Sequence, residues 1–266
     1  MDLQEDIRYE LLSTFSSDAF TMIGGQAVSS WRAALGLQDA TGTVSTSDLD
    51  FLFEMGAGGS ELLKAIAEKL GGHLHTATMD QATTQIAKLV VPHVGRRGEP
   101  LVVDLLSVPH GMDAKRVRRN ARRLRVNQGP VLRVMHPMHC LESAVANRLT
   151  LPSPKYRSRE YLTRIRAICE IVKAWTNECA KSEATVREAY RTVEALGRYA
   201  ETRLPIQLHR EEGIDVLSSL PDDCEQSPLL GDAFWRRRLP QIHSRVEAKR
   251  ERDRNRIEAT SGHHRP

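Results

Sequence analysis

Phe20-Thr-Met-Ile-Gly-Gly-Gln-Ala-Val28 carries the clearest structural pattern in this chain. It predicts a short apolar strand, a glycine pair and the start of a helix. A second stretch, Thr46-Ser-Asp-Leu-Asp-Phe51, predicts a loop that runs into another strand. Alternate residues of a strand face the same side, so Asp48 and Asp50 are expected to project together. Neighbouring carboxylates repel each other unless a cation neutralises them, which indicates a metal-dependent site.

A third carboxylate is expected beside this pair. Mg²⁺ favours carboxylate and phosphate oxygens, and two metal ions roughly 4 Å apart can activate an attacking hydroxyl and stabilise a leaving pyrophosphate. Such a site usually takes another acid from a neighbouring strand, and Asp104 lies within the apolar run Leu101–Leu106. An acid embedded in an apolar strand needs a reason to be there. Asp48, Asp50 and Asp104 are therefore the expected catalytic and metal-binding residues.

The glycine pair predicts a complementary phosphate site. A backbone that approaches a phosphate closely requires residues without a Cβ atom, as at Gly24 and Gly25. The free N–H groups of the helix that follows would face an anionic triphosphate. A lone Asp-x-Asp is usually a solvated strand end and a lone Gly-Gly is usually a turn. Their joint order, followed by an acid on a later strand, favours one site for a nucleoside triphosphate (NTP) and a divalent metal.

Together these residues resemble the nucleotidyltransferase superfamily of DNA polymerase beta, and most of all its bacterial AbiEii-type branch. That branch includes toxins of toxin–antitoxin and phage-defence systems. The resemblance covers roughly residues 18 to 175. It implies transfer of a nucleoside monophosphate from an NTP to an acceptor, with two Mg²⁺ ions as cofactors. It also implies that Thr46 and Ser47 of the acid motif, and Lys155 after the helix that follows the sheet, contact the nucleotide.

The chain departs from this family's pattern before the acid motif and also along the helical half, where the usual lysine and acidic signatures are not clear. AbiEii-like members often carry an arginine two residues before the Ser/Thr of the acid motif, where this chain has Val44. A cation for the triphosphate must then come from Lys88, from the basic block Lys115–Arg125 or from Lys155. The alternative function is a catalytically degenerate module of the nucleotidyltransferase fold that binds RNA or a protein partner.

Seven bases and no acid make up the basic block Lys115–Arg125. Such a density of cations favours a grip on the phosphates of RNA, although a solvated charged face is the common explanation of a basic run. RNA, and tRNA in particular, is the expected acceptor; an aminoglycoside-like small molecule or a protein side chain stays open, as does an antitoxin partner. The candidate nucleic-acid-binding residues are Lys115, Arg116, Arg118, Arg119, Arg122, Arg123 and Arg125.

A second basic region runs from Arg236 to Arg256, where acids interrupt the bases. Alternating charges of this kind predict an exposed helix joined by salt bridges more than a nucleic-acid arm. The net charge of the whole chain is +4. Its four cysteines form no C-x-x-C pair, no apolar run approaches ~18 residues, and no basic segment opens the chain, so we expect a cytoplasmic protein without a membrane anchor or zinc site.

The expected fold class is α+β, with two domains. Residues 1–134 are predicted to form the catalytic domain, a nucleotidyltransferase-like mixed β-sheet with flanking helices. Residues 135–258 form an all-helical domain, and residues 259–266 a disordered tail. The predicted strands are Phe20–Ile23, Leu49–Phe53, Gln85–Val91, Leu101–Leu106 and Val131–Val134, and the main predicted helices are 26–35, 60–70, 138–149, 159–180, 183–200 and 229–256.

Overall fold

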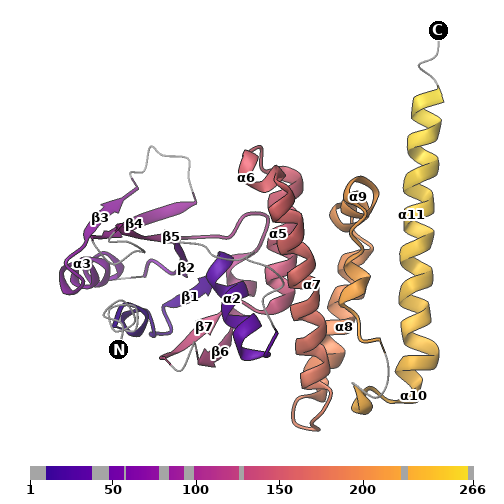
Figure 1. Cartoon of the computed structure of the whole chain (residues 1–266), viewed down its shortest axis with the longest axis horizontal. Helices are drawn as coiled ribbons and strands as arrows, with labels where there is room; N and C mark the ends of the chain where they lie inside the picture. The colour runs from indigo at the N-terminus through magenta and orange to yellow at the C-terminus, as the bar shows by residue number, and fades with distance from the viewer. Residues whose placement is uncertain are drawn as a thin grey trace. The chain divides into compact units, whose positions relative to one another are not determined.

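A computed structural model describes residues 10–37, 48–56, 58–77, 84–92, 99–125, 129–222 and 227–262. The chain divides into two compact units, unit 1 (Met1–Ser143) and unit 2 (Ala144–Pro266). The division falls inside helix α5 (Pro137–Thr150), whereas the sequence placed the boundary near residue 134. Unit 1 holds the sheet and unit 2 is helical (Figure 1). Mixed α/β architecture followed by a helical region is therefore confirmed.

Unit 1 is built on a seven-stranded mixed sheet of order β3-β4-β5-β2-β1-β7-β6. The pairs β2/β5 and β1/β7 are parallel, and the remaining neighbours are antiparallel. The strands are β1 (Phe20–Ile23), β2 (Leu49–Phe53), β3 (His73–Thr76), β4 (Gln85–Val91), β5 (Leu101–Leu106), β6 (Arg122–Arg125) and β7 (Val131–Val134).

Five of these strands have the bounds that the sequence predicts, and the two that it does not predict, β3 and β6, are the edges of the sheet. Edge strands are often short and polar, because one side of the strand meets water and charges there discourage pairing with another chain. Both strands fit that description, with mostly exposed residues in β3 and three arginines in β6. Without an alternating apolar pattern, they left no strand signal in the sequence.

One face of the sheet carries the core of unit 1. The rings of Phe15 and Phe51 stack at 4.6 Å between centroids, and those of Phe20 and Phe53 at 4.8 Å. Helix α2 (Gly24–Ala34) packs on this face, where Ser30 Oγ donates to the sulfur of Met22 at 3.5 Å. Helix α3 (Gly59–Lys69) also packs there, and Leu63 and Ile66 are buried. The opposite face is the one on which polar residues of the central strands lie.

Unit 2 is a set of helices with its own apolar core. Gly197 brings two of them close together, because a Cβ atom at this position would lie 3.2 Å from Cγ2 of Ile242. Ile165, Val172, Val193 and Val246 are almost fully buried in the core of this unit. The helical segments after α5 are α6 (Pro154–Arg157), α7 (Arg159–Cys179), α8 (Val186–Ala200), α9 (Arg203–Glu212), η2 (Val216–Ser219), η3 (Pro228–Leu230), α10 (Gly231–Ala233), η4 (Phe234–Arg238) and α11 (Leu239–Gly262).

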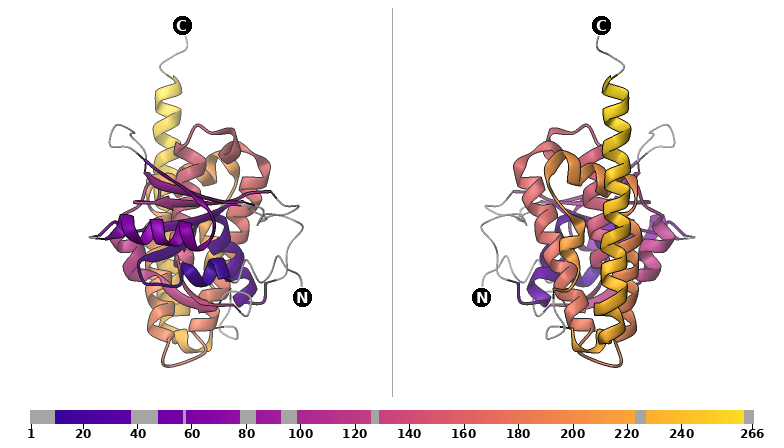
Figure 2. Two further views of the ribbon diagram at one scale, coloured as in Figure 1. Left: turned by 90° about the vertical axis from the view of Figure 1, so that its left-hand side faces the viewer. Right: turned by 90° about the vertical axis from the view of Figure 1, so that its right-hand side faces the viewer.

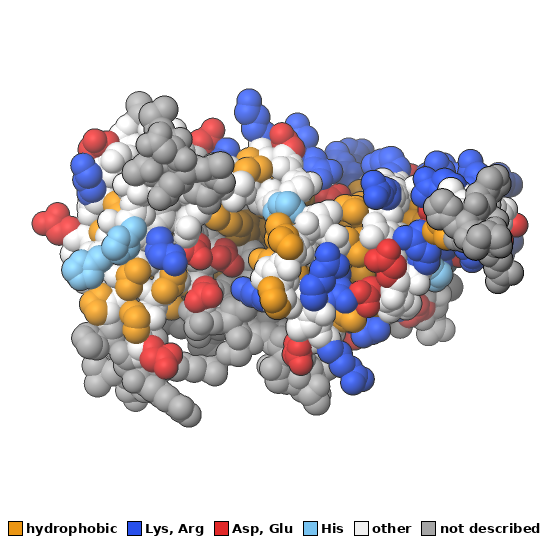
Figure 3. Space-filling model, turned by 90° about the horizontal axis from the view of Figure 1, so that it is seen from above, with side chains coloured by type: hydrophobic (Ala, Val, Ile, Leu, Met, Phe, Trp, Pro, Cys, Tyr) orange, Lys and Arg blue, Asp and Glu red, His pale blue; other side chains and the backbone are white. Residues whose placement is uncertain are grey.

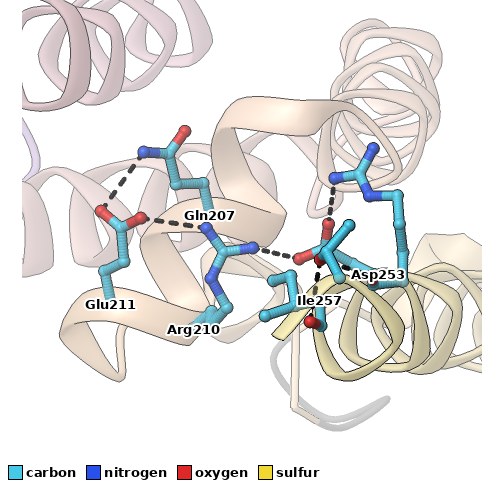
Figure 4. Close-up of polar contacts among 7 residues, drawn as sticks. Gln207, Arg210, Glu211, Asp253 and Ile257 are labelled. Atoms are coloured by element: carbon cyan, nitrogen blue, oxygen red, sulfur yellow. Dashed lines mark hydrogen bonds and ion pairs between the residues drawn. The ribbon is translucent and has the colours of Figure 1, made fainter. Parts of the chain in front are cut away.

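Helix α11 is joined to the rest of unit 2 by ion pairs, as the sequence predicts for this basic region. Arg245 pairs at 2.8 Å with Glu201, the residue that follows α8, and Arg210 of α9 pairs with Asp253 (Figure 4). The C-terminal turns of α11 extend past the other helices of unit 2 (Figure 2). The helix continues to Gly262, into the segment expected to be a disordered tail, while residues 263–266 lie outside the described part of the chain.

Candidate functional site

Asp50 and Asp104 lie side by side on the polar face of the sheet. They are Cα partners on the parallel strands β2 and β5. Neighbouring strands are about 4.8 Å apart, and residues in register point to the same face. Both residues are half-buried. The sheet therefore brings together two of the three carboxylates that the sequence selects, although they lie more than fifty residues apart in the chain.

The third carboxylate and a glutamine complete this acidic cluster. Asp48 is half-buried directly before β2 and is two residues from Asp50, which places the two on the same side of an extended chain. Gln85 of β4 donates from Nε2 to Oδ1 of Asp104 at 2.5 Å. This hydrogen bond restrains the orientation of the Asp104 carboxylate. The sequence did not single out Gln85, because its role depends on the pairing of β4 with β5.

The glycine motif contacts the acid motif directly. Gly24 has φ +66°, and a Cβ atom at this position would lie 2.1 Å from Oδ2 of Asp50. Any larger residue would thus displace the Asp50 carboxylate and also strain the backbone. Gly25 is buried in the first turn of α2, which starts without a side-chain cap at Ile23. The first N–H groups of a helix carry a partial positive charge, so an anion is favoured beside them.

Two further ionisable residues extend the line of acids across the sheet. Lys88 of β4 is the Cα partner of Asp104, and His75 of β3 is the Cα partner of Lys88. His75, Lys88, Asp104 and Asp50 thus form one row over four adjacent strands, named here the charged row. Figure 3 shows acidic side chains gathered on unit 1 with basic side chains and histidines nearby. The sequence left Lys88 as one of several candidate cations and did not select His75.

Mg²⁺ is compatible with these residues. Among the described residues, no group of three or more His, Cys, Asp or Glu side chains is arranged to hold a metal ion. Mg²⁺, however, is usually held by one or two carboxylates together with substrate phosphates and water. Asp50 and Asp104 in register supply such a pair, and the close approach of Gly24 keeps one carboxylate beside the start of α2. The donor set therefore fits a magnesium ion that is shared with a phosphate ligand.

The structure does not test the other predicted nucleotide-binding residues against this cluster. Thr46 and Ser47 lie outside the described residues. Lys155 belongs to unit 2, where it is exposed on α6 and its ammonium lies 5.9 Å from the centre of the Tyr156 ring. Their contact with a nucleotide stays a prediction.

The basic block Lys115–Arg125 divides between helix α4 (Ala114–Asn120) and strand β6 and lies near the far end of β2. Arg118 Nη2 donates to the carbonyl oxygen of Phe53 at 3.1 Å, and its Nη1 lies 3.4 Å from the Glu54 carboxylate. Phe53 ends β2, whereas Asp48 precedes its first residue. At about 3.3 Å per residue, the length of the strand separates Arg118 from Asp48. The block is therefore not part of the acidic cluster.

Most cations of this block have partners within unit 1. Arg116 pairs with Glu142 at 2.5 Å, and Arg123 pairs with Asp18 at 2.8 Å. Arg122 and Arg125 donate to backbone carbonyl oxygens at 2.9 and 3.1 Å. In the part of the chain that the structure describes, Lys115 and Arg119 are exposed and make no ion pair. Lys115 and Arg119 are thus the cations of the block that no described acid matches, and nucleic-acid binding by the seven residues stays a prediction.

Comparisons with known proteins assign no family to the chain. No family model matches it. No curated protein matches its sequence. Over the described helices, none combines the length and the apolar character that a membrane span requires. A function for this chain must therefore be argued from its own residues.

Proposed function

We propose that the chain is a Mg²⁺-dependent nucleotidyltransferase with a nucleotidyltransferase-like sheet in unit 1. One observation carries this proposal: Asp50 and Asp104 are in register on parallel strands while the carboxylate of Asp50 lies against Gly24. The acidic motif and the glycine motif are each a weak indicator of function. Their direct contact supports the proposal that they form one site. The Asp50 carboxylate, one of the proposed metal ligands, lies beside Gly24 at the start of α2, where a helix favours an anion.

The proposed reaction transfers a nucleoside monophosphate to an acceptor hydroxyl. The hydroxyl oxygen forms a bond to the α-phosphorus of the NTP, the bond between the α- and β-phosphates breaks, and pyrophosphate leaves. Asp104 accepts the hydroxyl proton, and Gln85 keeps its carboxylate in place. Asp48 and Asp50 hold Mg²⁺, which neutralises phosphate oxygens when it is bound. Gly24, Gly25 and the start of α2 receive the triphosphate.

The acceptor in this proposal is RNA, with tRNA as the first to test. Exposed cations at Lys115 and Arg119 support an anionic acceptor, since they make no ion pair among the described residues. A role as the toxin of a toxin–antitoxin or phage-defence pair would follow from modification of RNA. Growth arrest on expression that Asp48→Ala relieves would support this role.

Radiolabel transfer tests the activity. The full chain is incubated with each α-labelled NTP, Mg²⁺ and total tRNA, beside the double variant Asp48→Ala/Asp50→Ala and a reaction containing EDTA. We expect label in the RNA only with the unchanged chain and Mg²⁺. Equal labelling by the double variant, or no labelling by either protein over a panel of RNA, aminoglycoside and protein acceptors, would refute the proposal.

A non-catalytic module that binds RNA or a protein is the second candidate. Its support is the residue at position 44, where this chain has valine and AbiEii-like proteins often have an arginine. Calorimetry separates this candidate from the first. A binding module would bind RNA without measurable Mg²⁺-dependent affinity for any NTP, whereas the enzyme would bind Mg²⁺–NTP and lose that affinity on Asp50→Ala.

A further inference from the structure

The residues of the charged row lie one after another across the proposed site. At one end, Gly24 and the start of α2 lie against Asp50. Asp104 follows on β5, Lys88 on β4 and His75 on the edge strand β3. If the triphosphate lies at the start of α2, the hydroxyl that Asp104 deprotonates must approach from the opposite side of the row. Lys88 and His75 occupy that side.

Lys88 makes no ion pair with Asp104, the acid beside it, among the described residues. Opposite charges on Cα partners commonly form a cross-strand pair that stabilises the sheet. Here, however, the carboxylate of Asp104 accepts a hydrogen bond from Gln85 at 2.5 Å. Among the described residues, Lys88 makes no ion pair within 4.0 Å, and it is half-buried. A half-buried ammonium without a carboxylate partner favours an anionic ligand, because burial strengthens its interaction with that ligand.

We propose that Lys88, with His75 beside it, binds a phosphate of the acceptor and so selects a polyanionic acceptor, RNA. This inference rests on the proposed function and adds the residues that recognise the acceptor. An ammonium in this position would repel an aminoglycoside, which is itself a cation, and would attract the phosphodiester next to an accepting hydroxyl. His75 is exposed on β3, next to Lys88, and can donate a second hydrogen bond to the same phosphodiester of the RNA.

RNA binding and NTP binding are measured separately on the full chain. The probes are a short fluorescein-labelled single-stranded RNA, followed by anisotropy over a series of salt concentrations, and Mg²⁺–ATP, followed by calorimetry. Lys88→Met removes the charge and keeps most of the side-chain volume, and Lys88→Arg restores the charge. Lys64→Met is the matched control, because Lys64 is exposed on α3, which packs on the other face of the sheet.

We expect Lys88→Met to weaken RNA binding about fivefold at 0.1 M salt and to lower the salt slope by about 0.7, the value of one single-strand phosphate contact. Lys88→Arg recovers both quantities, and Lys64→Met changes neither. Mg²⁺–ATP affinity stays within about twofold in all three variants, because the triphosphate lies at the other end of the row. His75→Ala also weakens RNA binding, because it removes the second hydrogen-bond donor beside Lys88.

Two results would overturn the inference while leaving the proposed function in place. One is RNA affinity that neither Lys88→Met nor His75→Ala changes. The other is a loss of Mg²⁺–ATP affinity in Lys88→Met with RNA binding intact, which would assign Lys88 to the triphosphate. Should Lys88→Met fail to fold, His75→Ala alone decides, because its exposed position on the edge strand is tolerant of change. Failure of the proposed function has a different outcome, namely Mg²⁺–ATP affinity that Asp50→Asn does not change.

Discussion

The charged row of unit 1 and the arginines of η4 and α11 in unit 2 arrange their charges in opposite ways. In unit 2, Arg238 donates to Glu194 at 2.5 Å and Arg250 donates to Asp215 at 2.5 Å, so each cation is matched by an acid from another element. In unit 1, Asp50 and Asp104 stand next to each other, and the neighbouring Lys88 makes no ion pair among the described residues. Opposite charges are thus paired between elements of unit 2, whereas like charges lie side by side in the charged row of unit 1.

The difference shows how structural and functional charges can be told apart. Matched pairs stabilise the fold and lower the pKa of their acids. The hydrogen bond from Arg238, although opposed by burial, holds the pKa of Glu194 below its usual range. Adjacent carboxylates repel each other and stabilise the fold only when a ligand neutralises them. Substitutions in the row should therefore affect ligand binding and catalysis, and substitutions of paired residues should affect stability.

The largest effect is expected from Asp104→Asn. An amide cannot accept the hydroxyl proton, so transfer of the labelled nucleotide should fall about a hundredfold to ten-thousandfold. The midpoint of thermal unfolding should stay the same or rise, because the repulsion between Asp104 and Asp50 is removed. Rates of label transfer and melting curves are measured on the same preparations. A variant that melts early and transfers label at the normal rate would reverse this assignment.

Gly24→Ala and Gly36→Ala form a matched pair of variants. Both glycines have positive φ, +66° and +64°, so alanine strains the backbone at either position by about 1–2 kcal/mol. Only at Gly24 would the new Cβ meet the Asp50 carboxylate, since nothing lies within 4 Å at Gly36. We expect both variants to lose stability, and Gly24→Ala alone to lose Mg²⁺–ATP affinity in calorimetry. Equal binding by the two variants would show that the contact of the two motifs has no role.

Arg250→Met tests the paired charges of unit 2, because it removes the cation of one ion pair. The Arg250 side chain is only 7% exposed, and it pairs with Asp215, which is 36% exposed. Loss of the cation leaves Asp215 unmatched and should lower the free energy of unfolding by about 2 kcal/mol, less than for a fully buried pair because Asp215 still meets water. Urea denaturation measures the change. Mg²⁺–ATP affinity serves as the control and should not change.

A smaller effect on the stability of the fold is expected when the pH is lowered. Burial alone would raise the pKa of Asp215, but the hydrogen bonds from Arg250 and from the backbone N–H of Leu217 outweigh it and hold the pKa below the usual 3.8. The folded state thus favours the carboxylate. Its stabilisation is complete above the unfolded pKa and is lost as the pH falls below about 4. Unfolding midpoints of the unchanged chain and of Asp215→Asn should therefore differ at pH 7 and converge in acid.

The smallest effect on stability is expected from Lys115→Ala/Arg119→Ala, because neither residue makes an ion pair among the described residues. Melting curves should not change, whereas the salt slope of RNA binding should fall by about 1.4 if each cation binds one phosphate of a single strand. Arg123→Ala, which removes a cation already paired with Asp18, is the comparison. An equal loss of slope in both variants would contradict the expectation that Lys115 and Arg119 bind RNA phosphates in preference to the paired Arg123.

Much of unit 1 could be predicted because its central strands carry clear apolar patterns. Five strands have the expected bounds, and the helical nature of the second half is confirmed. The edge strands His73–Thr76 and Arg122–Arg125 could not be predicted, since their residues are polar and their pairing comes from neighbours distant in sequence. The same limit applies to the basic block. Its sequence suggests a single cationic surface, but in the fold three of its arginines form ion pairs with Asp18, Glu54 and Glu142.

The sequence by itself determined which residue types are available for chemistry: two glycines before a helix, two acids at the start of a strand and a third acid within an apolar run. These are local patterns, and local sterics and alternation suffice to interpret them. Only the tertiary structure decided that Asp50 meets Gly24, that Asp104 is in register with Asp50, and that Lys88 and His75 continue the same row. Strand register joins residues that are far apart along the chain, so no local pattern contains it.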